Sequence, residues 1–280
     1  MTTSTGTLLL LDLGGLPTGW ADSWGQAMPY VASLVEQGAW GPWAAPGWTD
    51  LGQAWRGFYA GQPPDTTSQG GLWPRLAQAG VSVGIMNLPA TWPPPQAPGW
   101  AVARLESAAQ ARAFTHPPEL AHDLGEYQGG QLALAGRPAF KPHQRDEAFA
   151  LWACQARLVW QEAQRLLAAA PLRLAGLGFQ GLGEIYTMFP DDPGRVALFF
   201  SQIDEYCQRL AQLLQPRSVL CLAGQAGFLA WAPGLIPPGE VAAARPWDLT
   251  PLALALLGLD IPPDWPGRPP VRLRSRDRHA

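Results

Sequence analysis

The sequence predicts an α/β fold in which a central, mostly parallel sheet is sandwiched by helices. Short apolar runs of strand length alternate with segments whose apolar residues recur at helical spacing. Glycines follow several of these helical segments, as expected at helix C-termini. With 280 residues, 47% of them hydrophobic and 15% charged, the chain also has enough apolar material to bury one large core.

The first half of the chain alternates between strands and helices. An apolar run over residues 7–12 predicts a buried strand that delivers Asp12 to a loop containing Gly14 and Gly15. Helix followed by strand, repeated, indicates parallel strands joined by crossover helices. The further elements predicted here are a helix over 28–37, a helical stretch over 51–59, a helix over 72–79 and a strand over 81–86.

The middle of the chain, residues 89–146, is predicted to be a cap or an insertion within a single domain that spans residues 1–280. It opens with a proline-rich stretch that cannot form regular structure, and it contains all the histidines except the one near the C-terminus. No low-complexity linker divides the chain into independent domains.

The periodic pattern returns after residue 146. Long helices are predicted over 147–170 and 193–214, strands over 172–178 and 218–223, and a final helix over 249–257 that Gly258 closes. The stretch 179–186, between the first of these strands and the second long helix, is predicted to be a loop.

Composition excludes some classes of partner. The net charge of −3 provides no basic field for a phosphate backbone, so nucleic acid is not expected as a partner. The N-terminus lacks a signal-peptide pattern, and its apolar run is too short to cross a bilayer. We therefore expect a cytoplasmic protein with no membrane contact.

Short motifs spread over most of the chain occur in an order typical of one family of enzymes. In chain order they are Asp12 with Gly14 and Gly15, Ala54-Trp55, Ala60-Gly61, Pro64, Asn87-Leu88-Pro89, Asp248, Leu256-Leu257-Gly258, Asp264 and Gly267-Arg268. Together they resemble the type I phosphodiesterase/nucleotide pyrophosphatase branch of the alkaline phosphatase superfamily. The resemblance implies a two-metal site at the carboxyl ends of the strands and a Thr or Ser nucleophile.

The positions that carry this chemistry hold other residues here. The resemblance places the nucleophile at Leu51, which has no nucleophilic atom, although Thr49 lies only two residues away and is a possible substitute. Asp12 is the one metal position that retains a ligand type. The metal positions that the resemblance implies are Asp12, Leu182, Tyr186, Gly224 and Gln225.

The remaining histidines do not suggest a replacement site. His116, His122 and His143 lack the i, i+4 spacing of a helical metal pair. Without metals, a carboxylate at the end of a buried strand must accept hydrogen bonds from the Gly14-Gly15 turn or have a raised pKa. A structural role for Asp12 is therefore at least as well supported as a functional one.

Three functional hypotheses follow. The first is a non-catalytic relative, a pseudoenzyme that binds a small ligand or a protein partner and needs no cofactor. The second is an active phosphate- or sulfate-ester hydrolase with a relocated site built from Asp12, Thr49, Asp50 and Glu184, which would need two divalent metals, zinc or manganese. The third is a scaffolding or interaction protein, for which an oligomer is possible.

Overall fold

The structure is a computed structural model that describes residues 6–44, 51–64, 71–135 and 140–274. The strands are β1 (Leu8–Leu13), β2 (Ala39–Gly41), β3 (Val83–Met86), β4 (Gly99–Val102), β5 (Thr115–His116), β6 (Leu174–Phe179), β7 (Ser218–Leu222), β8 (Phe228–Trp231) and β9 (Gly239–Glu240). The α-helices are α1 (Trp20–Trp24), α2 (Pro29–Gln37), α3 (Leu51–Ala60), α4 (Leu72–Gln78), α5 (Gly125–Leu134), α6 (Arg145–Leu167), α7 (Leu182–Met188), α8 (Pro193–Leu214) and α9 (Leu249–Leu256).

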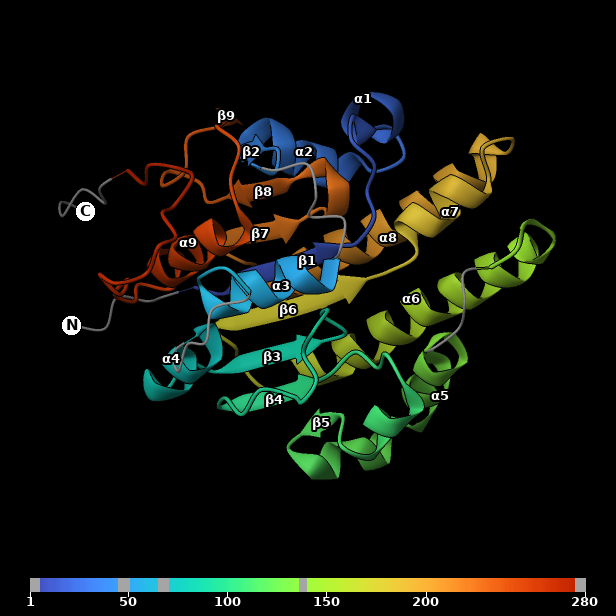
Figure 1. The fold of residues 1–280 in the computed structure, drawn as a ribbon, viewed down its shortest axis with the longest axis horizontal. Coiled ribbons are helices and arrows are strands. Elements are labelled where there is room, and N and C mark those ends of the chain that lie inside the picture. Colours follow the sequence, from blue (N-terminus) through green and yellow to red (C-terminus); the bar gives the residue numbers. More distant parts are fainter. Residues whose placement is uncertain (1–5, 45–50, 65–70, 136–139, 275–280) are drawn as a thin grey trace.

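In the described part of the chain, one mixed sheet runs through the molecule in the order β5-β4-β3-β6-β1-β7-β8-β2-β9 (Figure 1). The five strands from β4 to β7 are mutually parallel, with β1 between β6 and β7. β5 and β8 run antiparallel to their neighbours β4 and β7. The loops that follow β1, β6 and β7 therefore leave the sheet at the same edge, where ligands bind in folds of this type.

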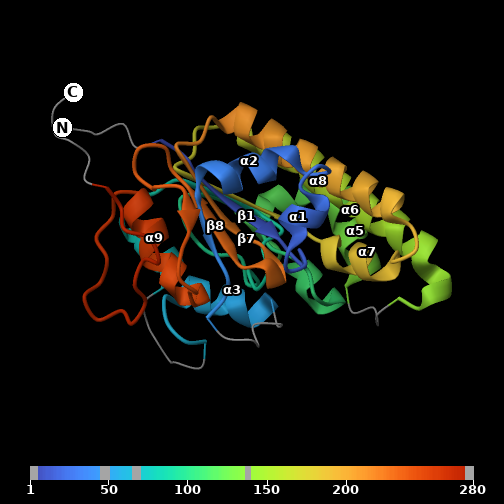
Figure 2. The ribbon, with the colours of Figure 1, turned by 90° about the horizontal axis from the view of Figure 1, so that it is seen from above.

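Helices cover both faces of the sheet, with α2, α6 and α8 on one face and α3 and α9 on the other (Figure 2). Alternate residues of β1 pack into the cores on the two faces of the sheet, because successive strand side chains point to opposite faces. Leu9, Leu11 and Leu13 belong to the core beneath α6 and α8, whereas Leu8 and Leu10 belong to the core beneath α3 and α9. The same alternation directs Asp12 toward α3.

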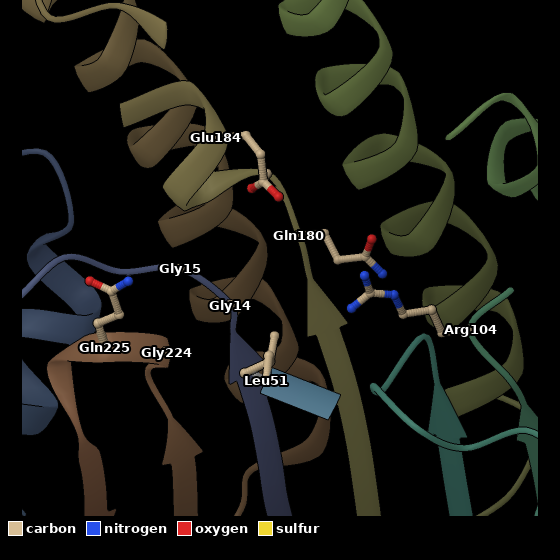
Figure 3. Close-up of a pocket in the computed structure, with 9 residues that line it drawn as sticks. Gly14, Gly15, Leu51, Arg104, Gln180, Glu184, Gly224 and Gln225 are labelled. Carbon is tan, nitrogen blue, oxygen red and sulfur yellow. The ribbon is translucent and has the colours of Figure 1, made fainter. Parts of the chain in front are cut away.

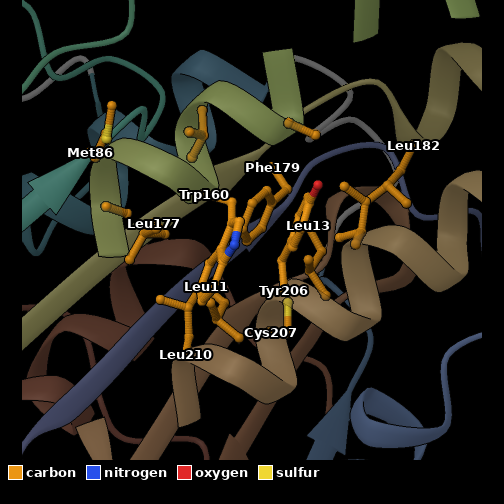
Figure 4. Packing of buried hydrophobic residues seen from close by; sticks show 14 of the residues in the cluster. Leu11, Leu13, Met86, Trp160, Leu177, Phe179, Leu182, Tyr206, Cys207 and Leu210 are labelled. Carbon is orange, nitrogen blue, oxygen red and sulfur yellow. The ribbon is translucent and has the colours of Figure 1, made fainter. Parts of the chain in front are cut away.

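Aromatic packing fills the first of these cores (Figure 4). The rings of Trp160 on α6 and Tyr206 on α8 stack with centroids 5.5 Å apart and planes 9° from parallel. Phe179, at the end of β6, contacts Tyr206 with a centroid separation of 5.9 Å. This packing fixes the two long helices against the strand whose exit loop borders the site.

The predicted α/β fold class is confirmed, and the predicted elements match closely. The helix predicted over 193–214 has those bounds in the structure, and the strand predicted over 7–12 is β1. One local prediction was wrong: residues 182–188 form α7 rather than a loop. Gly181, the residue before this helix, takes a φ of 91°, which glycine adopts without strain, and the helix begins at the next residue.

The middle segment, 89–146, contributes both sheet strands and a helix. β4 and β5 extend the sheet beyond β3, and α5 packs against α6. No helix in the described ranges is both long enough and apolar enough to cross a bilayer.

Candidate functional site

Asp12 lies at the carboxyl end of the central strand and is completely buried. Its Oδ1 accepts a hydrogen bond of 3.2 Å from the indole Nε1 of Trp55, on α3. Its Oδ2 has no hydrogen-bond partner among the described residues. Burial raises the pKa of the Asp12 carboxyl from its ordinary 3.8 to about 7, although the Arg104 guanidinium and the Trp55 indole oppose the shift.

A cavity of about 180 Å³ opens beside Asp12, where the loops after β1, β6 and β7 converge (Figure 3). Arg104 and Gln180 reach into it from one side, and the carboxylate of Glu184 points toward it from α7. The residues that line it are Gly14, Gly15, Leu51, Arg104, Gln180, Gly181, Glu184, Gly224 and Gln225.

The structure brings some of the sequence-predicted site residues together and separates others. Leu51, Gly224 and Gln225 line the cavity, with Asp12 beneath Gly14. Leu182 is fully buried in the core under α8, and 41% of Tyr186 is exposed outside the cavity. Thr49 and Asp50, which the relocated-site hypothesis requires, lie outside the described residues.

Three glycines, two of which line the cavity, bring the loops into backbone contact. A Cβ atom on Gly224 would lie 2.4 Å from the backbone nitrogen of Gly15, and one on Gly15 would lie 2.6 Å from the nitrogen of Gly183. Gly224 and Gly15 also have φ angles of 56° and 85°, which glycine adopts without strain. A side chain at position 224, including an aspartate, therefore does not fit unless the loops move apart.

Arg104 is the cavity residue that the sequence analysis missed. It lies just after β4 in the middle segment, and its backbone is held by hydrogen bonds on both sides. Its own N–H donates to Thr91 Oγ1 at 3.4 Å, and the N–H of Leu105 donates to Gln131 Oε1 at 3.2 Å. The sequence around Arg104 carries no motif, so only the pairing of β4 with β3 reveals its proximity to Asp12.

Gln180 is oriented by a buried hydrogen-bond network centred on Asn87, which follows β3. The Asn87 Oδ1 accepts from Gln180 Nε2 at 3.1 Å, from Gln131 Nε2 at 2.6 Å and from Tyr127 Oη at 3.2 Å. Its Nδ2 donates to the carbonyl of Gly178 at 2.7 Å. The network ties α5 of the middle segment to the cavity wall.

The donor set does not fit the pair of divalent metals that the family resemblance implies. Such ions need several carboxylates or imidazoles at fixed places. Among the described residues, no three His, Cys, Asp or Glu side chains are grouped so as to hold a metal ion. The cavity instead presents the guanidinium of Arg104, and the glycine contacts leave no room for a carboxylate at position 224.

Comparison with known proteins gives structural matches but no sequence matches. No protein-family model matches this sequence, and the search of curated proteins found no match. A 2-O GAG sulfatase superposes with a TM-score of 0.57 at 9% identity, over 94% of this chain and 72% of that chain. A putative sulfatase from Bacteroides thetaiotaomicron gives 0.53 at 11% identity, over 94% and 73% of the two chains.

A third structure, i-CgsB solved in complex with a neocarrahexaose, superposes with a TM-score of 0.54 at 13% identity, over 95% of this chain and 75% of that chain. Identities this low show a shared fold. That fold is the α/β fold of these sulfatases, with a central, mostly parallel sheet flanked by helices, as the sequence predicted.

Proposed function

We propose that this protein is a non-catalytic relative of the metal-dependent phosphodiesterases, and that it binds a phosphate or sulfate ester in the cavity beside Asp12. The observation that carries the proposal is the backbone contact of Gly224 with Gly15. This contact occupies the space in which the family resemblance places a metal-binding aspartate. At position 224 the loops leave no room for a metal-binding carboxylate.

The nucleophile position supports the same conclusion. Leu51 is the first residue of α3 and lines the cavity. Its side chain has no atom that can attack phosphorus or sulfur. The start of a helix still presents backbone N–H groups and the positive end of the helix dipole, both of which favour an anion.

An anionic ligand is favoured by Arg104. Its guanidinium lines the cavity and makes no hydrogen bond or ion pair with another described residue. A planar guanidinium binds phosphate and sulfate oxygens with two parallel N–H donors. Asp12 opposes an anion only weakly near neutral pH, because its pKa of about 7 leaves much of the carboxyl protonated.

An active hydrolase with a relocated site is the competing function. The carboxyl groups of Asp12 and Glu184 both lie at or beside the cavity, which favours it. Thr49 and Asp50 would have to supply the nucleophile and a further ligand. The scaffolding role and the cytoplasmic location remain predictions that no finding tests.

The deciding experiment measures binding and turnover on one sample. Zinc and manganese content is determined by elemental analysis on protein purified without chelator. Phosphate and sulfate binding is then followed by calorimetry, and hydrolysis of nitrophenyl phosphodiesters and nitrophenyl sulfate is assayed with added zinc or manganese. Arg104→Gln tests the anion site, and Arg112→Gln, an exposed arginine outside the cavity, is the matched control.

We expect substoichiometric metal, no turnover above background, and oxyanion binding that Arg104→Gln weakens by roughly 10- to 100-fold, the worth of a charged hydrogen-bonded pair. Stoichiometric metal with turnover would establish the relocated hydrolase instead. Folded protein that binds neither phosphate nor sulfate would refute the ligand-binding proposal.

A further inference from the structure

A second hollow, of about 620 Å³, adjoins the cavity and shares Gly15, Glu184 and Gln225 with it. Its other walls are mostly aromatic and apolar. They include Leu134, Phe140, Trp152, Tyr186 and Met188. A ligand whose oxyanion lies beside Arg104 therefore has a continuous path, past Glu184, into this groove.

Two charged side chains line the cavity at separate places. Figure 3 shows the guanidinium of Arg104 next to Gln180, with the carboxylate of Glu184 on the other side of Gln180. Neither group forms a hydrogen bond or an ion pair with another described residue. A simple dianion is attracted by Arg104 and repelled by Glu184, whereas a ligand that carries both charges satisfies both groups.

The walls of the groove favour the same kind of ligand. Ammonium groups bind over the faces of Trp, Tyr and Phe rings, and most strongly where water is excluded. Trp152 and Tyr186 line the groove next to Glu184; Trp152 is 8% exposed and Tyr186 is 41% exposed. Glu184 therefore borders both the oxyanion cavity and a set of aromatic side chains.

We propose that the ligand is a zwitterionic ester, with its phosphate or sulfate group at Arg104 and its ammonium group between Glu184 and the aromatic side chains of the groove. This inference rests on the proposed function and adds the class of ligand to it. This arrangement places the cation on the Glu184 side of the oxyanion.

A matched ligand pair tests the charge alone. Phosphocholine and 3,3-dimethylbutyl phosphate have the same shape, and they differ in whether the terminal group is a quaternary nitrogen or a carbon. Calorimetric titration of the unmodified protein should show phosphocholine binding at least 10-fold more tightly. Because this comparison needs no mutation, it does not depend on the folding of a variant.

Substitutions test which residue causes the preference for phosphocholine over 3,3-dimethylbutyl phosphate. Glu184→Gln should reduce the phosphocholine preference to about 3-fold or less, because phosphocholine loses its partner while 3,3-dimethylbutyl phosphate, an anion, is no longer repelled. Glu119→Gln, an exposed glutamate elsewhere, should leave the preference unchanged. Arg104→Gln should weaken both ligands.

The two proposals fail in different ways. If both esters bind equally well and both depend on Arg104, the zwitterion inference is wrong and the oxyanion site stands. If phosphocholine is preferred but the preference survives Glu184→Gln, the placement of the cation is wrong. If neither ester binds, or if Arg104→Gln has no effect, the proposed function itself is overturned.

Discussion

The indole N–H of Trp55 donates a hydrogen bond to one carboxyl oxygen of Asp12, and the other oxygen has no partner in the described part of the chain. The position of Asp12 in the sequence predicted either backbone donors from the Gly14-Gly15 turn or a raised pKa. The structure shows the raised pKa, together with a side-chain donor from the opposite layer. Only one of the two carboxyl oxygens thus has a hydrogen-bond partner among the described residues. The stability of the fold therefore depends on the protonation of Asp12.

Stability should fall as pH rises from about 4 to about 7. The folded protein holds the Asp12 proton up to pH 7, whereas the unfolded chain releases it near 3.8, so the folded state binds more protons in this window. Asp12→Asn removes this dependence. Between pH 5 and pH 8, wild type should lose about 2–3 kcal/mol more unfolding free energy than the variant.

Denaturant unfolding in EDTA at the two pH values measures this difference. The comparison is between pH values, so the intrinsic cost of the buried amide cancels. A wild-type protein whose pH dependence equals that of the variant would show that Asp12 titrates at an ordinary pKa.

Trp55→Phe should raise the pKa of Asp12 further, because the indole hydrogen bond stabilises the carboxylate form. The expected additional shift is on the order of one unit. The titration of the Asp12 carboxyl carbon by NMR reports it directly. Trp265→Phe is the control: this indole is also buried but belongs to the C-terminal segment, so the Asp12 titration should not move. A lowered pKa in Trp55→Phe would contradict the assignment.

Gly224→Ala should destabilise the protein by about 3 kcal/mol or more, through the clash with Gly15 added to the positive-φ strain. Gly80→Ala separates the two causes. Gly80 has a similar φ of 62° but nothing within 4 Å of the added methyl group, so it should cost only about 1 kcal/mol. Thermal and denaturant unfolding of both variants measures the difference. Equal losses of stability in the two variants would mean that the loops around Gly224 move apart without a cost in free energy.

Asn87→Ala should cost about 2–4 kcal/mol, because it leaves the buried donors of Tyr127, Gln131 and Gln180 without their shared acceptor. Asn87 also has a φ of 62°, which alanine tolerates poorly. Asn87→Gly removes the side chain without that backbone cost, so the cost that the two variants share belongs to the network. Urea unfolding measures the loss of unfolding free energy in each of the two variants. A near-neutral Asn87→Gly would show that the three donors find other partners.

The sequence was sufficient for the scaffold, and it also grouped three positions that line one cavity. Apolar periodicity located β1 and α8, and motif spacing placed Leu51, Gly224 and Gln225 around one cavity. These predictions depend on local pattern and chain order, which one sequence contains.

The direction in which individual side chains point could not be predicted from the sequence. Leu182 occupies a position at which the family resemblance implies a metal ligand, yet Gly181 starts α7 there and turns the leucine into the core. Arg104 reaches the cavity through the pairing of β4 with β3, a long-range register that no local pattern specifies. Sequence spacing identifies a position, and the backbone path decides where its side chain points.

The close contacts of Gly15 with Gly183 and with Gly224 also have an evolutionary consequence. A substitution that introduces an aspartate at position 224 meets the backbone of Gly15 before the new carboxylate can reach a metal ion. The loops would first have to separate, and each separating change loses stability while it gains no activity. Selection that acts on one substitution at a time therefore favours no first step from this chain toward a metal centre at the carboxyl end of β7.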